Sequence, residues 1–101
     1  MQKEINLDIE NEYIKSLTIQ TNYLKNDNSL VLRILTETFD EEEKIFVKLF
    51  DGENLLGDVT GKNVDIKINS FESSKKFTLQ FDVEKNNKII SSFKKSLSFE
   101  I

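Results

Sequence analysis

The residues of this 101-residue chain that could do chemistry are acids, serines and lysines, because the sequence contains neither histidine nor cysteine. The absence of histidine removes the commonest general base and the commonest metal ligand. The absence of cysteine removes thiolate chemistry and disulfides, and it leaves the redox compartment unconstrained. Three kinds of chemistry remain to be compared with the residue spacing: cation binding by carboxylates, acid–base catalysis by paired carboxylates, and a serine nucleophile activated by lysine.

Two acidic segments contain the carboxylate oxygens that a hard cation prefers. Residues 40–43 (DEEE) lack the spaced ligands of an EF-hand, and we interpret them as a solvated acidic loop. Residues 51–54 (DGEN) resemble a fragment of a calcium loop, but their neighbours Phe50, Leu55 and Leu56 are apolar. An Asp-Gly pair between apolar segments instead predicts a β-hairpin with a type I′ turn.

The remaining catalytic patterns are equally incomplete. Ser73 and Lys76 have the Ser-x-x-Lys spacing without its accompanying motifs. The only acid in an apolar setting is Asp82, between Phe81 and Val83, and strand alternation places it on the outward, solvated face. Three glycines in the whole chain exclude a Gly-rich loop that cradles phosphates. We therefore expect no catalytic, cofactor-binding or metal-binding residues, and we expect that the protein is not an enzyme.

The distribution of charge argues against nucleic acid and membranes as partners. The net charge is −4, and the positive residues are mixed with a larger number of acids. Lys75–Lys76 and Lys94–Lys95 lie near Phe77 and Phe93, a combination that could bind single strands by stacking and charge. Both phenylalanines belong to the inward phase of their strands, and the lysines are typical of protected sheet edges. The sequence contains no segment long enough for a membrane-spanning helix and no readable signal peptide, so we expect synthesis in the cytoplasm.

Apolar residues recur at every second position along most of the chain, which predicts half-buried strands and no helix. Residues 29–35 are mostly apolar on both faces, which is typical of a central strand. The expected strands cover residues 3–9, 16–21, 29–35, 44–50, 54–59, 63–69, 76–84 and 88–101.

Several details of these strands can be predicted individually. Gly57 and Gly61 indicate a bulge or a bend, and Phe71 is expected to be exposed or half-buried in a polar loop. The last two strands form a long hairpin that turns at residues 85–87 and has an aromatic inner face. The inward phase of the final strand contains Ile89, Phe93, Leu97, Phe99 and Ile101, with Ser91 and Lys95 interrupting it.

These features together predict one domain over residues 1–101, with an antiparallel immunoglobulin-like β-sandwich of seven to nine strands. A length near 100 residues is enough for one core without disulfides or metals. No linker, internal repeat or low-complexity segment divides the chain.

The order of the segments carries a resemblance to a known family. The relevant stretches are residues 3–9, 27–34, 47–52, 77–83, 88–90 and 97–101. Together they resemble the N-terminal immunoglobulin-like domain of the upper baseplate proteins of tailed phages that infect Gram-positive bacteria. The family often has Pro-Gly before the penultimate strand, where this chain has Ser74, Lys75 and Lys76. The resemblance implies a structural role in a phage tail or a phage-tail-like bacteriocin particle, and it implies no catalytic residues.

Three functions remain as hypotheses. The first is a structural or adaptor protein that binds other subunits of an assembly through loops and edge strands, with a homo-oligomer among the expected arrangements. It would reside in a virion tail or tail-like particle assembled in the bacterial cytoplasm. The second is a small acidic inhibitor that covers a basic enzyme surface with Glu37 and residues 40–43. The third is a carbohydrate-binding module, for which Tyr13, Tyr23 and Phe71 are the candidate aromatic platforms.

Overall fold

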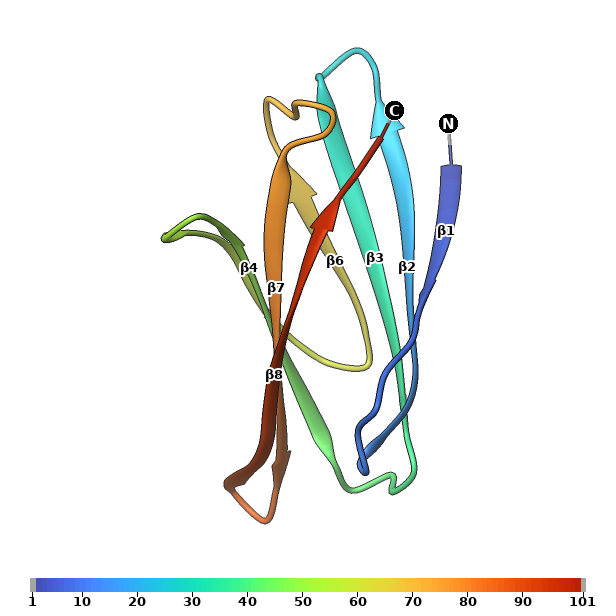
Figure 1. The fold of residues 1–101 in the computed structure, drawn as a ribbon, viewed down its shortest axis with the longest axis vertical. Coiled ribbons are helices and arrows are strands. Elements are labelled where there is room, and N and C mark those ends of the chain that lie inside the picture. Colours follow the sequence, from blue (N-terminus) through green and yellow to red (C-terminus); the bar gives the residue numbers. More distant parts are fainter. Residues whose placement is uncertain (1, 101) are drawn as a thin grey trace.

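The computed structural model describes residues 2–100, which form eight antiparallel strands in two facing sheets (Figure 1). The prediction of an all-β sandwich of seven to nine strands is confirmed, and no helix occurs within this range. The strands are β1 (Gln2–Leu7), β2 (Ile14–Leu24), β3 (Ser29–Thr38), β4 (Lys44–Asp51), β5 (Asn54–Thr60), β6 (Asn63–Ile68), β7 (Lys76–Lys85) and β8 (Lys88–Ser98).

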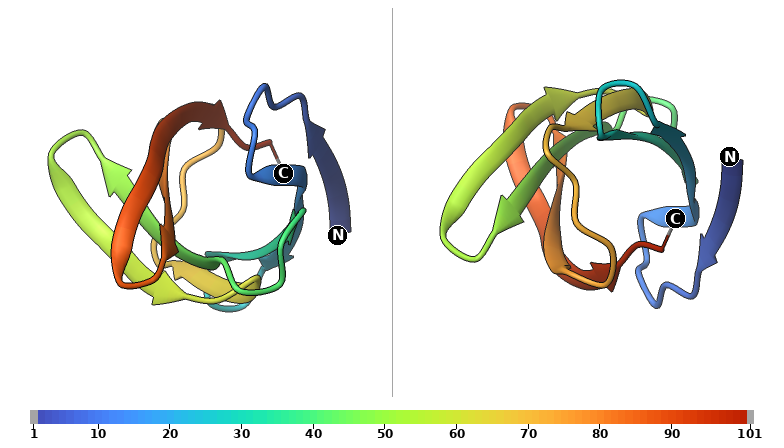
Figure 2. Two further views of the ribbon diagram at one scale, coloured as in Figure 1. Left: turned by 90° about the horizontal axis from the view of Figure 1, so that it is seen from below. Right: turned by 90° about the horizontal axis from the view of Figure 1, so that it is seen from above.

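The strand order is that of an immunoglobulin-like Greek key with one additional strand. The first sheet has the order β1-β2-β3-β6 and the second has the order β5-β4-β7-β8. Strands β2 to β8 form the seven-stranded Greek key, and β1 is added at the edge beside β2. The chain passes between the sheets after β3, β5 and β6, and the view along the long axis shows the two curved layers around a shared interior (Figure 2).

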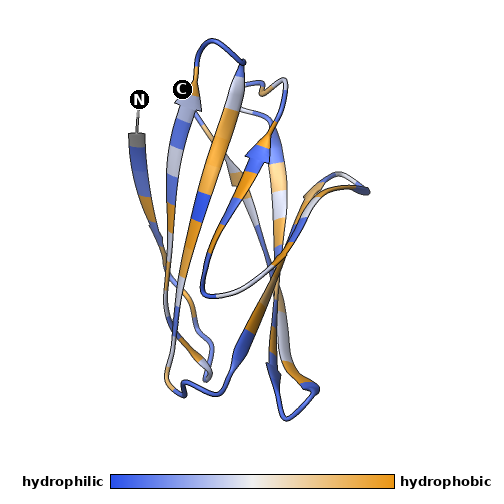
Figure 3. Cartoon of the chain, turned by 180° about the vertical axis from the view of Figure 1, so that it is seen from behind, coloured by the Kyte–Doolittle hydropathy of each residue, from blue (hydrophilic) through white to orange (hydrophobic). Residues whose placement is uncertain are grey.

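The core lies between the sheets because the inward positions of both are almost entirely apolar. Figure 3 shows the resulting alternation of hydrophobic and hydrophilic positions along the strands. Phe81 on β7 is fully buried and stacks on the half-buried Phe93 of β8, with ring centroids 5.1 Å apart. The central strand was predicted correctly: β3 lies between β2 and β6, with Leu30, Leu32 and Ile34 buried.

Two hairpins of the second sheet use different turns, and this corrects one prediction. The β4–β5 hairpin turns at Gly52 and Glu53, but only Gly52 has a positive φ, of 60°. That pattern is type II′, whereas the predicted type I′ turn needs a positive φ at both central residues. The type I′ pattern is found in the β7–β8 hairpin, where Asn86 and Asn87 have φ values of 53° and 63°.

A bulge in β8 overturns the predicted orientation of one side chain. The ladder between β7 and β8 shifts after Val83, so Ile90 is an extra residue and Ile89 lies opposite Glu84. Ile89 therefore points outward and is 54% exposed, although it was predicted to be in the inward phase. The strand ends at Ser98 rather than at residue 101, and Ile101 lies outside the described residues.

One end of the sandwich is closed by aromatic rings, and here a second prediction was wrong. Phe71 is buried rather than exposed or half-buried, because its ring lies between those of Tyr23 and Phe77, each 6.3 Å away between centroids. Phe77 in turn lies 6.2 Å from Phe99, which is buried just beyond the end of β8. A hydrogen bond of 2.9 Å from the Phe71 N–H to the Asn28 carbonyl oxygen fixes the loop that carries Phe71.

The β5–β6 side of the sandwich depends on a glycine. As predicted, a bulge occurs beside Gly57, where the β4–β5 ladder shifts and leaves Leu56 as the extra residue. A Cβ atom added at Gly57 would lie 2.7 Å from Cγ2 of Ile66 on β6, which is closer than such atoms approach in proteins. The missing side chain therefore allows the two sheets to come into contact at this point.

Candidate interaction surfaces

The acidic loop between β3 and β4 is held against the β7–β8 hairpin. The Asp40 carboxylate accepts a hydrogen bond from the Lys85 ammonium group and another, of 3.0 Å, from the Glu42 backbone N–H. These two bonds, with the Lys85 bond the larger cause, hold the pKa of Asp40 below its ordinary value. The same bond raises the pKa of Lys85. Asp40 is therefore engaged within the protein and is not free to bind a cation or a basic partner.

Glu43 corrects the interpretation of the whole loop as solvated. Its side chain is only 4% exposed, and its Oε2 atom is buried without a hydrogen-bond partner. The pKa of Tyr13 is raised first by the charge of Glu12, then by burial and a hydrogen bond with Glu12, and to a smaller extent by the charge of Glu43. Even with this buried acid, residues 2–100 contain no group of three or more acids that could hold a metal ion.

The acidic surface that an inhibitor would use is consequently small. Glu41 and Glu42 are exposed, but the Glu37 carboxylate accepts a hydrogen bond of 3.0 Å from the Ser16 hydroxyl. With Asp40 paired and Glu43 buried, two of the five acids remain without such partners in the described part of the chain. This arrangement weakens the hypothesis of an acidic decoy.

The residues considered for catalysis are not brought together. Ser73 and Lys76 are both exposed, and no hydrogen bond joins them within the described range. Asp82 lies on the outer face of β7, as predicted, and accepts hydrogen bonds from the Ser92 hydroxyl and the Gln80 side-chain amide. A carboxylate held by neutral donors on an open sheet face has no feature of a catalytic acid.

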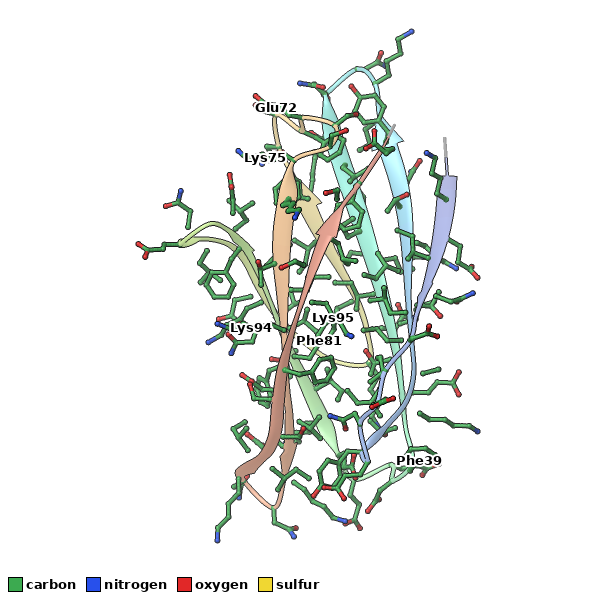
Figure 4. All side chains as sticks on the ribbon, in the orientation of Figure 1. Phe39, Glu72, Lys75, Phe81, Lys94 and Lys95 are labelled. Atoms are coloured by element: carbon green, nitrogen blue, oxygen red, sulfur yellow. The ribbon has the colours of Figure 1, made fainter. Side chains whose placement is uncertain are left out.

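The aromatic residues considered for sugar binding are also occupied. Tyr13 and Tyr23 are half-buried against the core, and Phe71 is buried. The Tyr23 hydroxyl donates a hydrogen bond of 2.7 Å to the Asn28 side-chain oxygen. The exposed ring that sequence reasoning missed is Phe39, at 65% exposure on the loop after β3 (Figure 4). None of the three rings that the sequence suggested is therefore free as an exposed platform.

The two polar residues that interrupt the inward phase of β8 cross an open side of the sandwich. Ser91 accepts a hydrogen bond of 2.9 Å from the Asn11 side-chain amide, and Lys95 donates one of 3.3 Å to the Asp8 carbonyl oxygen. Lys94 and Lys95 point to opposite sides of β8 (Figure 4). Between β8 and the segment after β1 runs a groove of about 380 Å³, lined by Asp8, Ile9, Glu10, Phe93, Lys94 and Lys95.

A second hollow lies over the outer faces of β1, β2 and β3, with a volume of about 320 Å³. Three of the six polar residues that line it, Glu4, Gln20 and Arg33, are engaged with one another or with β6. Gln20 donates a hydrogen bond of 3.2 Å to Glu4, and Arg33 forms an ion pair of 3.0 Å with Asp65. These internal bonds reduce the number of polar groups that the hollow offers to a ligand.

The β4–β5 hairpin projects from the body of the sandwich (Figures 1 and 2). Its strand β5 presents two adjacent leucines to solvent, Leu55 at 52% and Leu56 at 42% exposure, beside the half-buried Phe50. An ion pair of 2.7 Å between Asp51 and Lys75 ties the turn end of the hairpin to the β6–β7 loop, and this bond raises the pKa of Lys75. The sequence signal for this surface was the adjacent pair Leu55 and Leu56, which interrupts the strict alternation of apolar and polar residues along the strand.

The four edge strands differ in the charge that they present. In the first sheet, both edges carry mixed charges: Lys3 and Glu4 on β1, and Asp65 and Lys67 on β6. In the second sheet, each edge has a single sign. The only charged residue of β5 is Asp58, whereas β8 contains three lysines and no acid. The two edges of the second sheet are therefore complementary to each other.

Comparisons with known proteins leave the family open. No protein-family model matches the chain, and its sequence has no significant match among curated proteins. Within residues 2–100 there is no helix long and apolar enough to cross a bilayer.

Proposed function

We propose that this chain is a non-enzymatic structural or adaptor protein of a phage tail, or of a phage-tail-like particle, and that it binds neighbouring protein subunits through its sheet edges and loops. Two observations support the proposal. The segments quoted above resemble the immunoglobulin-like domain of phage upper baseplate proteins, and the described residues present edge strands to solvent rather than a reactive cleft.

The observation that carries the docking role is the β4–β5 hairpin. An edge strand has unpaired backbone N–H and C=O groups, which can pair with a strand of another protein. Here those groups are accompanied by Leu55 and Leu56, which are about half exposed, on a hairpin that projects from the body of the molecule (Figure 1). Covering such apolar side chains adds a hydrophobic contribution to the hydrogen bonds of the added strand.

The proposal is tested by purifying the tagged full chain from its native cells and examining the material by electron microscopy. We expect the chain in a tail-type particle, and we expect the Leu55→Ser/Leu56→Ser variant to be lost from it. Ile89→Ser is the matched control, because Ile89 is a comparably exposed apolar residue on the other hairpin of the same sheet. Recovery of the chain only as free protein would contradict the proposal.

A further inference from the structure

Residues at the two edges of the second sheet lie in one row across its outer face. Lys48 on β4 pairs with Asp58 on β5 and with Gln80 on β7, and Gln80 pairs with Lys94 on β8. The row therefore begins with an acid at one edge and ends with a base at the other. The neighbouring row runs through Phe46 on β4 and Asp82 on β7. It ends in a small hydroxyl residue at each edge, Thr60 on β5 and Ser92 on β8.

The charges at the two ends of the row have no ion-pair partner among residues 2–100. Asp58 and Lys94 are both exposed, and within the described residues neither takes part in an ion pair. The free edge of β8 faces the groove of about 380 Å³, across which side-chain hydrogen bonds join Ser91 to Asn11 and Lys95 to Asp8, so an added strand has to replace these two bonds. The exposed hairpin residues beside Asp58 leave the β5 edge accessible as well.

We propose that copies of this chain associate edge to edge, with β8 of one copy added to β5 of the next, so that the second sheet continues from copy to copy. This inference rests on the proposed assembly role and names the partner, which is a second copy of the chain. The strand directions allow it. Strands β5 and β7 are each antiparallel to β4, and β8 is antiparallel to β7, so a copy displaced along the sheet presents β8 antiparallel to β5.

If the sheet continues without a shift of register, the row places Lys94 of one copy opposite Asp58 of the next. Opposite charges in directly facing positions of neighbouring strands stabilise the pairing, and like charges destabilise it. Pairing of β8 with β8 would bring lysines together, and pairing of β5 with β5 would bring two acids close to each other. The charges therefore favour the unlike pairing, β8 with β5, over both like pairings.

This interface uses different surfaces on the two partners. Such a head-to-tail contact repeats to form a closed ring when the rotation between copies closes, and an open fibre when it does not. Either product exceeds a dimer in size. The size of the assembly is thus the first quantity to measure.

The test is the mass of the purified full chain in solution, by light scattering after gel filtration and by sedimentation velocity over a range of concentrations. We expect species larger than a dimer that become smaller as salt is added, because exposed charge pairs are screened. Asp58→Lys and Lys94→Asp should each abolish the association, because each creates like charges across the interface. Mixing the two variants should restore the association, because both kinds of contact between them pair opposite charges. Where β5 comes from the Asp58→Lys variant, its new lysine faces the new aspartate on β8 of the Lys94→Asp variant. Where β8 comes from the Asp58→Lys variant, its unchanged Lys94 faces the unchanged Asp58 of the other.

Lys3→Asp is the matched control, because it reverses an exposed charge that has no ion-pair partner among the described residues, on the edge strand β1 of the other sheet, and it should leave the assembly unchanged. Circular dichroism and melting curves verify that the variants, all at exposed positions, remain folded. Any one of three results would overturn the inference: the wild-type chain is monomeric, both single variants still assemble, or the mixture of the two variants stays monomeric. A monomeric chain recovered in native particles rejects this interface alone, whereas an assembling chain absent from any particle rejects the proposed function alone.

Discussion

The two ends of the sandwich are closed by opposite kinds of interaction. At one end, four aromatic rings pack in succession from Tyr23 to Phe99, through Phe71 and Phe77. At the other end, the loops after β1 and β3 are bonded to the β7–β8 hairpin by polar and charged groups. Apolar packing contains no group that titrates and no charge that salt can screen, whereas hydrogen-bonded charges respond to pH and to screening. We therefore expect that the polar end can loosen under conditions that leave the aromatic end intact.

Truncation in the aromatic end should have the largest effect. Phe77→Ala removes the ring that contacts both Phe71 and Phe99, and we expect a loss of about 3–5 kcal/mol in the free energy of unfolding. Urea unfolding followed by circular dichroism measures this loss. Phe39→Ala is the control at the polar end, where the ring is exposed and its removal should change stability little. Equal losses for the two variants would remove the proposed difference between the ends.

The β5–β6 side offers a second apolar contact, intermediate in strength. Gly57→Ala forces a methyl group against Cγ2 of Ile66, and overpacking of this kind costs about 1–3 kcal/mol. Ile66→Leu removes Cγ2 while conserving volume, so the double variant should lose less stability than the sum of the single variants. Additive losses in urea unfolding would show that the close approach to Ile66 is not the cause.

At the polar end, Asn11 is the residue with the most partners. Its side-chain oxygen accepts hydrogen bonds from the N–H groups of Tyr13 and Ile14, and its amide donates to Ser91. Asn11→Ala leaves these partly buried groups unpaired, and we expect a loss of about 1–3 kcal/mol in the free energy of unfolding. Ser91→Ala removes only one of the bonds, so its effect should be the smaller. The reverse order would contradict the role assigned to Asn11.

The smallest expected effect is a change in acid sensitivity at the polar end. The pKa of Asp40 is lowered mainly by its bond to Lys85, so the folded state binds this proton less readily than the unfolded state. The stabilisation is therefore complete above the ordinary aspartate pKa and is lost as the pH falls through the lower pKa of the folded protein. Asp40→Asn and Lys85→Met should both flatten this part of the stability curve, measured by urea unfolding at a series of acid pH values.

Amide exchange locates the same effect within the molecule. In the wild-type protein, acid should speed the opening of the loop around Glu42, whose N–H bonds to Asp40, after correction for the intrinsic pH dependence of exchange. The N–H of Phe71, at the aromatic end, should show no such change. Acid-induced opening at both ends together would show that the sandwich responds as one unit.

The alternation of apolar residues was sufficient to predict the strands, the central place of β3 and the sandwich. It was not sufficient where pairing or tertiary contact decides orientation. Ile89 points outward because of a bulge, and a bulge is a property of two strands that one strand does not reveal. Phe71 and Glu43 lie in polar stretches of sequence, and they are buried by segments far away along the chain. Ser91 and Lys95 broke the pattern for a reason that only their partners, Asn11 and Asp8, make visible.

The position of Phe99 has a consequence for synthesis on the ribosome. This ring closes the aromatic end and lies just beyond β8, so a nascent chain that has not yet released β8 and Phe99 exposes Phe77 and leaves one edge of β7 unpaired. Non-local strand pairing is slow compared with the microseconds in which small helical chains fold, and incomplete sheets with open edges aggregate readily. The test is to fuse a stalling sequence after residue 100 through linkers of increasing length. The nascent chain should become resistant to protease only when the linker is long enough to carry Phe99 out of the exit tunnel.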